Sequence, residues 1–126
     1  MQRLIDISEL HVAYGSSLVL EGIDMHLDQG EIAVILGGSG CGKSTLLKTI
    51  IGLVSPRSGH VEILGQNLPE LNNEEQQSLL QRIGVMFQYG ALLNSLTVGE
   101  NVALPLEMHA GLDPVLVEDI VRTRLH

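Results

Sequence analysis

Cysteine, basic residues and long apolar runs are scarce in this sequence of 126 residues, and each shortage excludes a class of protein. The single cysteine, Cys41, allows no internal disulfide, which favours a reducing, cytosolic setting. Fifteen acidic residues against seven basic ones give a net charge of −8, and DNA or RNA phosphates would repel such a chain. The longest apolar run covers only residues 32–36, whereas a membrane-spanning helix needs about 20 such residues.

The hydrophobic pattern of the chain changes near residue 30. Before it, apolar residues alternate with polar ones, as in Ile5 and Ile7, which predicts half-buried antiparallel strands. Residues 31–36 form a short continuous apolar run, typical of a parallel strand buried on both faces. Two further strands are expected at residues 60–64 and 84–87, the second of them also buried.

Residues that favour helix starts or interrupt helices occur at several places in the rest of the chain. Asn73 is expected to cap a polar helix, and Thr97 with Glu100 forms a capping-box pattern. Asp113 precedes a proline that suits the first position of a helix. Pro105 is expected to kink or interrupt the helix in which it lies. The predicted helices cover residues 43–51, 73–82, 97–109 and 115–125.

The strongest motif is the octapeptide Gly-Gly-Ser-Gly-Cys-Gly-Lys-Ser at residues 37–44, which matches the phosphate-loop pattern G-x-x-x-x-G-K-[ST] at every position. At average residue frequencies, a chance match in a chain of this length is on the order of one in a few hundred. The motif also follows a predicted strand and opens a predicted helix. The alternative, a glycine-rich turn with an exposed lysine, is disfavoured by both observations.

Each residue type in this loop suits the binding of a polyphosphate. Glycines let backbone N–H groups approach the anion, and the helix that begins near Lys43 directs its positive dipole end toward it. Lys43 supplies an ammonium group for the β- and γ-phosphates, and Ser44 supplies a hydroxyl for Mg²⁺. Cys41 has two interpretations, a small filler or a thiol acidified by the helix N-terminus.

A glutamine ends the predicted strand at residues 84–87. In phosphate-loop enzymes a polar residue at such a position can hold Mg²⁺ or the attacking water. From the residues alone, a surface glutamine at a strand end explains Gln88 equally well.

Taken together, these features resemble the ATP-binding subunit of an ABC transporter. The resemblance covers nearly the whole chain and is far more specific than the phosphate loop alone. It is carried by Tyr14-Gly15, residues 37–47, Leu64-Gly65, residues 85–88 and residues 96–102.

The resemblance assigns roles to residues outside the phosphate loop. It implies that Tyr14 stacks on adenine, that Gln88 contacts Mg²⁺ and senses the γ-phosphate, and that residues 89–107 receive a helix of a membrane subunit. An ordinary strand-end tyrosine is the alternative for Tyr14, and the apolar residues of the 89–107 segment are expected to divide between surface and core. These apolar residues are Leu92, Leu93 and Leu96.

The complete set of predicted site residues follows from the loop and the resemblance together. Lys43 and Gln88 are the predicted catalytic residues, and Ser44 and Gln88 the predicted Mg²⁺ ligands. The predicted nucleotide-binding residues are Tyr14, Gly37, Gly38, Ser39, Gly40, Cys41, Gly42, Lys43, Ser44 and Thr45.

Other family elements are not found in the sequence. An ABC ATPase also carries an LSGGQ-like signature, a strand ending in Asp-Glu and a switch histidine, and none of these occurs in the 126 residues. We therefore expect an α/β phosphate-loop core of the ABC type that is incomplete at its C-terminus and binds ATP without turnover. Its expected parts are a mainly antiparallel β region (1–30), a core reaching the glutamine loop (31–94) and the start of a helical subdomain (95–126).

The resemblance also implies partners and a location. The full protein would bind ATP and Mg²⁺, form a homodimer, and contact membrane permease subunits on the cytoplasmic face of the inner membrane. Residues 88–93 and 101–106 resemble most the Mla or Mce branch, which transports phospholipids or other lipids. The alternatives are a soluble ABC ATPase without a transporter, and a phosphate-loop kinase or GTPase, which would need an N-K-x-D or arginine-lid motif that the sequence lacks.

Overall fold

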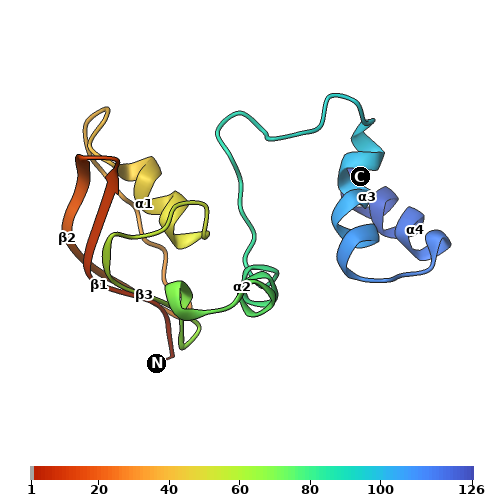
Figure 1. The fold of residues 1–126 in the computed structure, drawn as a ribbon. Coiled ribbons are helices and arrows are strands. Elements are labelled where there is room, and N and C mark those ends of the chain that lie inside the picture. Colours follow the sequence, from red (N-terminus) through yellow and green to blue (C-terminus); the bar gives the residue numbers. More distant parts are fainter. Residues whose placement is uncertain (1) are drawn as a thin grey trace. The chain divides into compact units, whose positions relative to one another are not determined.

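The computed structural model describes residues 2–126, and the chain forms two compact units (Figure 1). The first unit comprises Met1–Val85 and the second Met86–His126. The first contains a sheet with two helices, and the second contains a pair of helices. Among the described residues, no helix combines the length and the apolar character that crossing a bilayer requires.

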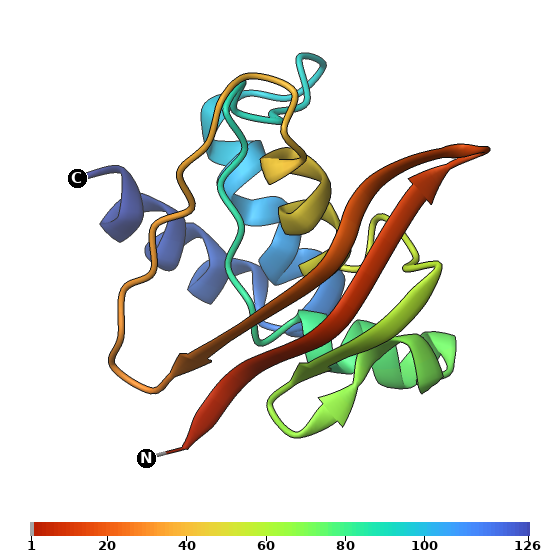
Figure 2. The ribbon, with the colours of Figure 1, turned by 90° about the vertical axis from the view of Figure 1, so that its left-hand side faces the viewer.

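A four-stranded antiparallel sheet organises the first unit. Its strands are β1 (Arg3–Tyr14), β2 (Ser17–Asp28), β3 (Ser58–Ile63) and β4 (Gln66–Asn67), in the spatial order β2-β1-β3-β4. The strands β1 and β2 form a long twisted hairpin (Figure 2). The antiparallel strands predicted before residue 30 and the strand predicted at residues 60–64 are therefore confirmed.

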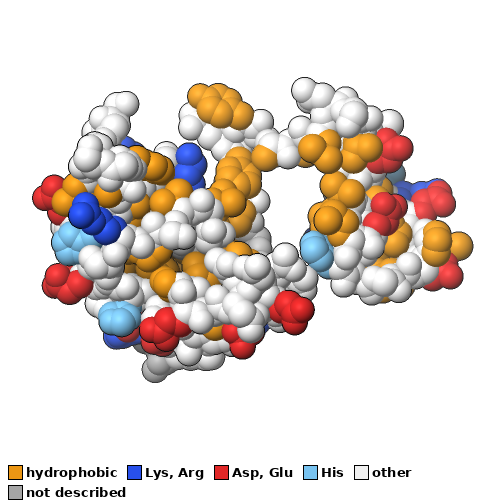
Figure 3. Space-filling view, viewed as in Figure 1, with side chains coloured by type: hydrophobic (Ala, Val, Ile, Leu, Met, Phe, Trp, Pro, Cys, Tyr) orange, Lys and Arg blue, Asp and Glu red, His pale blue; other side chains and the backbone are white. Residues whose placement is uncertain are grey.

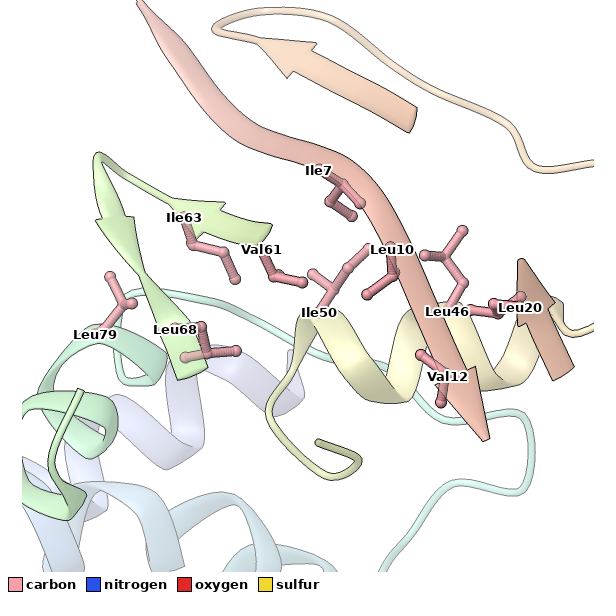
Figure 4. Close-up of a cluster of buried hydrophobic side chains, with 10 residues drawn as sticks. All are labelled: Ile7, Leu10, Val12, Leu20, Leu46, Ile50, Val61, Ile63, Leu68 and Leu79. Carbon is pink, nitrogen blue, oxygen red and sulfur yellow. The ribbon is translucent and has the colours of Figure 1, made fainter. Parts of the chain in front are cut away.

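An aliphatic core joins this sheet to helix α1 (Lys43–Ile50). Leu46 and Ile50 lie on the buried face of the helix and point toward the sheet (Figure 4). Burying a large aliphatic side chain contributes about 1.5–3 kcal/mol, so this face fixes α1 against β1. The buried cluster contains Ile7, Leu10, Val12, Leu20, Leu46, Ile50, Val61, Ile63, Leu68 and Leu79.

The N-cap of the other helix of the first unit lies one residue earlier than expected. Helix α2 (Asn73–Leu80) follows a short 3₁₀ turn, η1 (Leu68–Glu70). Asn72, rather than Asn73, is its N-cap: its side chain accepts hydrogen bonds from the backbone amides of Glu74 and Glu75. The helix also ends at Leu80 rather than residue 82, since the next residues form a turn.

Two strands predicted from continuous apolar runs do not form in this structure. Residues 31–36 have no regular secondary structure, and Ile32 and Leu36 are 94% and 86% exposed. Residues 84–87 are also irregular, and Met86 is 94% exposed. A parallel strand requires a parallel neighbour on at least one side, and every strand pair in the described residues is antiparallel. These two predictions are wrong for the structure described.

The second unit is a helical hairpin. Helices α3 (Val98–His109) and α4 (Pro114–Leu125) pack together around Ala103 and Val117. The predicted caps are confirmed, because Thr97 caps α3 and Asp113 accepts a hydrogen bond from the first turn of α4. Of the two predicted effects of Pro105, interruption is wrong, because α3 continues through this residue. The proline has no N–H to donate to the preceding turn.

Substitution of a glycine tests how closely β3 approaches β1. Gly59 has φ +97°, and a Cβ there would overlap the backbone of Glu9. Gly65 has φ +80°, but a Cβ there would meet nothing within 4 Å. We expect Gly59→Ala to lower the free energy of unfolding by about 2–4 kcal/mol and Gly65→Ala by about 1 kcal/mol, measured by urea denaturation. Equal losses for the two variants would contradict the steric account.

Candidate nucleotide-binding site

The phosphate loop enters α1 through a left-handed glycine. Gly42 is the N-cap residue of α1, with φ 101° and ψ 6°. Within the described residues no side chain caps this helix, whereas α2, α3 and α4 each have a side-chain cap. The backbone N–H groups of Lys43, Ser44 and Thr45 belong to the first turn of α1, where no preceding helical carbonyl can accept them. The first helical bond runs from the Leu46 amide to the Gly42 carbonyl, at 2.9 Å.

Two glycines of this loop, Gly37 and Gly42, have side-chain atoms close to the place where a Cβ would lie. A Cβ on Gly42 would lie 2.6 Å from Cδ2 of Leu20 and 3.3 Å from Cγ1 of Val19. A Cβ on Gly37 would lie 2.5 Å from Sγ of Cys41. At both positions the nearest atoms belong to side chains, which would have to move to admit a Cβ, and Gly42 also has a left-handed backbone that favours glycine.

The Lys43 side chain folds back over the loop. Its Nζ donates hydrogen bonds to the carbonyl oxygens of Gly37, at 2.7 Å, and Gly38, at 2.6 Å. The same ammonium lies 3.5 Å from Sγ of Cys41. The loop thus holds a positive charge beside the uncapped first turn of α1, and both features attract an anion.

A hollow of about 260 Å³ lies between the phosphate loop and the end of the β1–β2 hairpin. Tyr14, the last residue of β1, lies on one side, and its side chain is half exposed. The first turn of α1 lies on the other side. The structure therefore brings together two features that are about thirty residues apart in the sequence. The lining residues are Tyr14, Val19, Gly40, Gly42, Lys43, Ser44 and Thr45.

Val19 is a residue of this hollow that the sequence analysis missed. It lies in β2, is half buried and packs against the core. Its place in the sequence, between Leu18 and Leu20, shows only that it faces the opposite side of the strand from them. No motif marks it, because its proximity to Gly42 depends on how α1 packs on the hairpin.

Of the remaining predicted loop residues, Gly37, Gly38 and Cys41 contact the Lys43 side chain, while Ser39 lies exposed at the turn. Cys41 is also exposed.

Gln88 belongs to the second unit and lies in an exposed turn. The turn is closed by a hydrogen bond from the Gly90 amide to the Phe87 carbonyl, at 3.2 Å. Gly90 and Ala91 both have left-handed backbone conformations, with φ values of 79° and 54°. The Gln88 side chain is therefore presented on a tight turn rather than at the end of a strand.

The segment at residues 89–107 divides between surface and core. Leu92 and Leu93 are 65% and 50% exposed, whereas Leu96 is half buried and Ala103 of α3 is buried. Exposed apolar side chains are visible on this unit in Figure 3. Large contiguous apolar patches on a surface mark interaction sites, and Leu92 and Leu93 are two of the exposed apolar residues of this unit.

Comparison with known proteins identifies the family. A family model described as ABC transporter matches residues 20–125.

The chain belongs to the ABC transporter ATP-binding family.

This membership confirms the resemblance seen in the sequence.

Relatives in the family transport different substrates according to their names. The chain is 35% identical, over 98% of its length, to the intermembrane phospholipid transport system ATP-binding protein MlaF of Haemophilus influenzae. It is 36% identical, over 96% of its length, to the probable ribonucleotide transport ATP-binding protein mkl of Mycobacterium leprae. It is 42% identical, over 84% of its length, to the methionine import ATP-binding protein MetN of Rhizobium etli. The chain covers 47%, 35% and 28% of these three proteins, respectively.

Solved structures show the same fold. The ATP-binding cassette MJ0796, in a dimeric structure bound to ADP and Pi, superposes with a TM-score of 0.86 at 28% identity, over 95% of this chain and 55% of that one. The ABC transporter component cbiO1 of Clostridium perfringens gives a TM-score of 0.76 at 28% identity, over 98% of this chain and 48% of that one. The predicted α/β fold of ABC ATPase type is therefore confirmed, and the chain spans about half of the cassettes it matches.

The cap of α3 generates a prediction about pH. The Thr97 amide donates to Oε2 of Glu100 at 2.7 Å, and the Glu100 amide donates to Oγ1 of Thr97 at 3.2 Å. The backbone bond and then the side-chain bond from Thr97 lower the pKa of Glu100 below the 4.5 of an unperturbed glutamate. A lowered pKa means that the cap stabilises α3 above pH 4.5, and that this stabilisation is lost as pH falls through the lower pKa.

We expect a carbon-detected NMR titration to give Glu100 a pKa below 4.5. Glu100→Gln should remove the pH dependence of the α3 N-terminus, because the amide still accepts from Thr97 but does not ionise. Glu107→Gln, near the other end of α3, is the matched control. A Glu100 pKa at or above that of a free glutamate would show that the cap does not form.

Proposed function

We propose that this chain is the nucleotide-binding part of an ABC transporter ATP-binding subunit and that it binds MgATP in the hollow between Tyr14 and α1. The observation that carries the proposal is the combination of an uncapped helix N-terminus, a loop-bound ammonium and an aromatic ring around one hollow. The first two suit the phosphates of a nucleoside triphosphate, and the third suits its base.

The donor set of the loop fits a triphosphate with its metal ion. The free amides at the start of α1 and the Lys43 ammonium are donors only, and they suit phosphate oxygens. When ATP binds, the Lys43 ammonium would give up its hydrogen bonds to the carbonyls of Gly37 and Gly38 and donate to the β- and γ-phosphates instead. The Ser44 hydroxyl is an oxygen ligand of the kind that Mg²⁺ prefers. Thr45 is buried and would contribute its backbone amide.

The adenine ring would stack on Tyr14. The half-exposed ring lines the hollow, and Val19 adds an apolar side chain to the same lining. Stacking is tolerant of the base but requires an aromatic face, and Tyr14 is the only aromatic residue before Phe87. Gly40 and Gly42 complete the wall without side chains that would obstruct the phosphates.

In the whole protein, Lys43 and Gln88 would act in ATP hydrolysis, with Ser44 and Gln88 as Mg²⁺ ligands. The assignment of Gln88 is supported by the resemblance and by its exposure on the turn at residues 87–90. Hydrolysis also needs a water-activating carboxylate and a signature motif, which this sequence does not contain. We therefore expect this chain to bind ATP without turnover.

The organisation of the whole protein follows the family. We propose that residues 1–30, 31–94 and 95–126 are the antiparallel β region, the phosphate-binding core and the beginning of the helical subdomain. The whole protein would dimerise, as the cassette MJ0796 does, and would lie on the cytoplasmic face of the inner membrane. Residues 89–107 would contact the permease, with Leu92 and Leu93 as exposed apolar contacts.

Lipid is the transported substrate that we propose. The motivating observation is the 35% identity to MlaF, which extends over 98% of the chain, together with the loop residues 88–93 and 101–106. The match to MetN is higher in identity but covers 84% of the chain. The second candidate is an ABC ATPase that acts without a membrane subunit.

Substitution of the loop lysine tests nucleotide binding. Lys43→Ala removes the ammonium that faces the phosphates, and we expect it to weaken binding of a fluorescent ATP analogue with Mg²⁺ by about tenfold or more, since a charge-assisted bond contributes about 1.5–3 kcal/mol. Lys48→Ala is the matched control, because Lys48 is the only other lysine and lies exposed at the far end of α1. Unchanged affinity in Lys43→Ala would refute the site.

Cross-linking from the exposed leucine tests the transport assignment. A photoreactive amino acid at position 92, in the full-length protein expressed in its native cells, should cross-link to an integral membrane protein that mass spectrometry identifies as a transporter permease. The same group at position 48, on the exposed side of α1, serves as the control. Cross-links to ribosomal or DNA-repair proteins alone would favour the soluble ABC ATPase.

A further inference from the structure

The side chain of Asn101 makes an unusual number of hydrogen bonds to one loop. Its Oδ1 accepts from the Leu93 amide at 2.9 Å. Its Nδ2 lies within hydrogen-bonding distance of three carbonyl oxygens, those of Leu93 at 3.1 Å, Leu96 at 3.3 Å and Thr97 at 2.9 Å. A primary amide has two N–H groups and an oxygen with two lone pairs, so both the donor and the acceptor end of this side chain are engaged by residues 93–97.

The contacts with Leu93 resemble a pairing between strands. Both backbone groups of Leu93 are engaged by the same amide, which acts as a neighbouring strand residue would. The Leu93 carbonyl also accepts from the Leu96 amide at 3.1 Å, which closes a turn. The Asn101 backbone amide donates to the Thr97 carbonyl at 3.0 Å. Asn101 therefore holds residues 93–97 to the first turn of α3.

The chain immediately before this turn is also held in a specific shape. Ala91 has a left-handed backbone at φ 54°, which costs a non-glycine residue about 1 kcal/mol. Such a conformation persists where the neighbouring structure fixes it, and here Leu93 is fixed two residues later. Leu92 lies between the two constraints and is 65% exposed.

We propose that Asn101 is a positioning residue that holds residues 89–97 in the shape that presents Leu92 and Leu93 to the membrane subunit. The identity of the partner rests on the proposed function, whereas the positioning itself does not. A hydrophobic pair on a preorganised loop binds with a smaller loss of conformational entropy than the same pair on a mobile one. Asn101 would thus support the partner surface without touching the partner through its own side chain.

The effect of Asn101 on the stability of α3 can be separated from its effect on the loop at residues 93–97. Alanine has a higher helix propensity than asparagine, so Asn101→Ala should leave the helicity of α3 unchanged or slightly higher. A loss confined to the loop therefore cannot be attributed to a weaker helix. Asn94→Ala, in the same turn and exposed, is the matched control.

Amide hydrogen exchange in this chain tests the positioning directly. In Asn101→Ala we expect the Leu93 amide to exchange about tenfold faster or more, because its acceptor is removed, while α3 amides and Asn94→Ala stay at wild-type rates. Equal Leu93 exchange in wild type and Asn101→Ala would overturn the proposal.

Cross-linking from position 92 of the full-length protein then tests the consequence. If the wild type cross-links a permease, Asn101→Ala should reduce the yield severalfold and Asn94→Ala should not. An undiminished yield in Asn101→Ala would overturn the role in presentation. If the wild type cross-links no membrane protein, the proposed function fails, and with it the role of Asn101 in presenting Leu92 and Leu93 to a partner. The exchange measurement still decides whether Asn101 holds the loop.

Discussion

The burial of one face of α1 against the sheet is the constraint on which the site depends. Leu46 and Ile50 are 6% and 7% exposed, and they fix the helix beside β1. The N-terminus of the helix is then fixed as well, with its uncapped amides at one edge of the hairpin. A helix of 8 residues would be marginal by itself, so this packing supplies most of its stability.

Three consequences follow from this anchoring. The loop before α1 must turn sharply beside the hairpin. The turn gives position 42 a φ of 101°, a backbone conformation that favours glycine. The Lys43 side chain emerges over the loop carbonyls and keeps its charge beside the first turn. Tyr14 ends β1 at the same place, so base and phosphate recognition come from two elements joined by the core. The geometry that supports nucleotide binding is thus a result of aliphatic packing.

Local signals in the sequence predicted local structure well. The phosphate loop, the alternating strands before residue 30 and the caps by Thr97 and Asp113 all depend on residues within a few positions of each other. The strands predicted at residues 31–36 and 84–87 do not form. Their apolar pattern predicts burial on both faces but does not specify which neighbouring strands would cover them. The structure places Tyr14 at the same hollow as the phosphate loop, whereas its stacking on adenine stays a prediction of the family resemblance.

The contacts that sequence reasoning missed are those made between elements. Val19 reaches the hollow only because α1 packs on the hairpin, and Asn101 contacts Leu93 eight positions away. An asparagine inside a predicted helix carries no sign of such a contact, because it is equally common on a solvent-exposed face. Asn72 and Asn73 illustrate the same limit at short range, since two adjacent asparagines offer the same capping group and only backbone geometry selects one.

The most direct test of the central claim is an NMR titration of this chain with MgATP. The account predicts that the amide signals of residues 38–45 and the ring signals of Tyr14 shift together with one affinity, while the signals of β3 and β4 move little. Shifts confined to other parts of the chain, with the loop amides and Tyr14 unaffected, would contradict it.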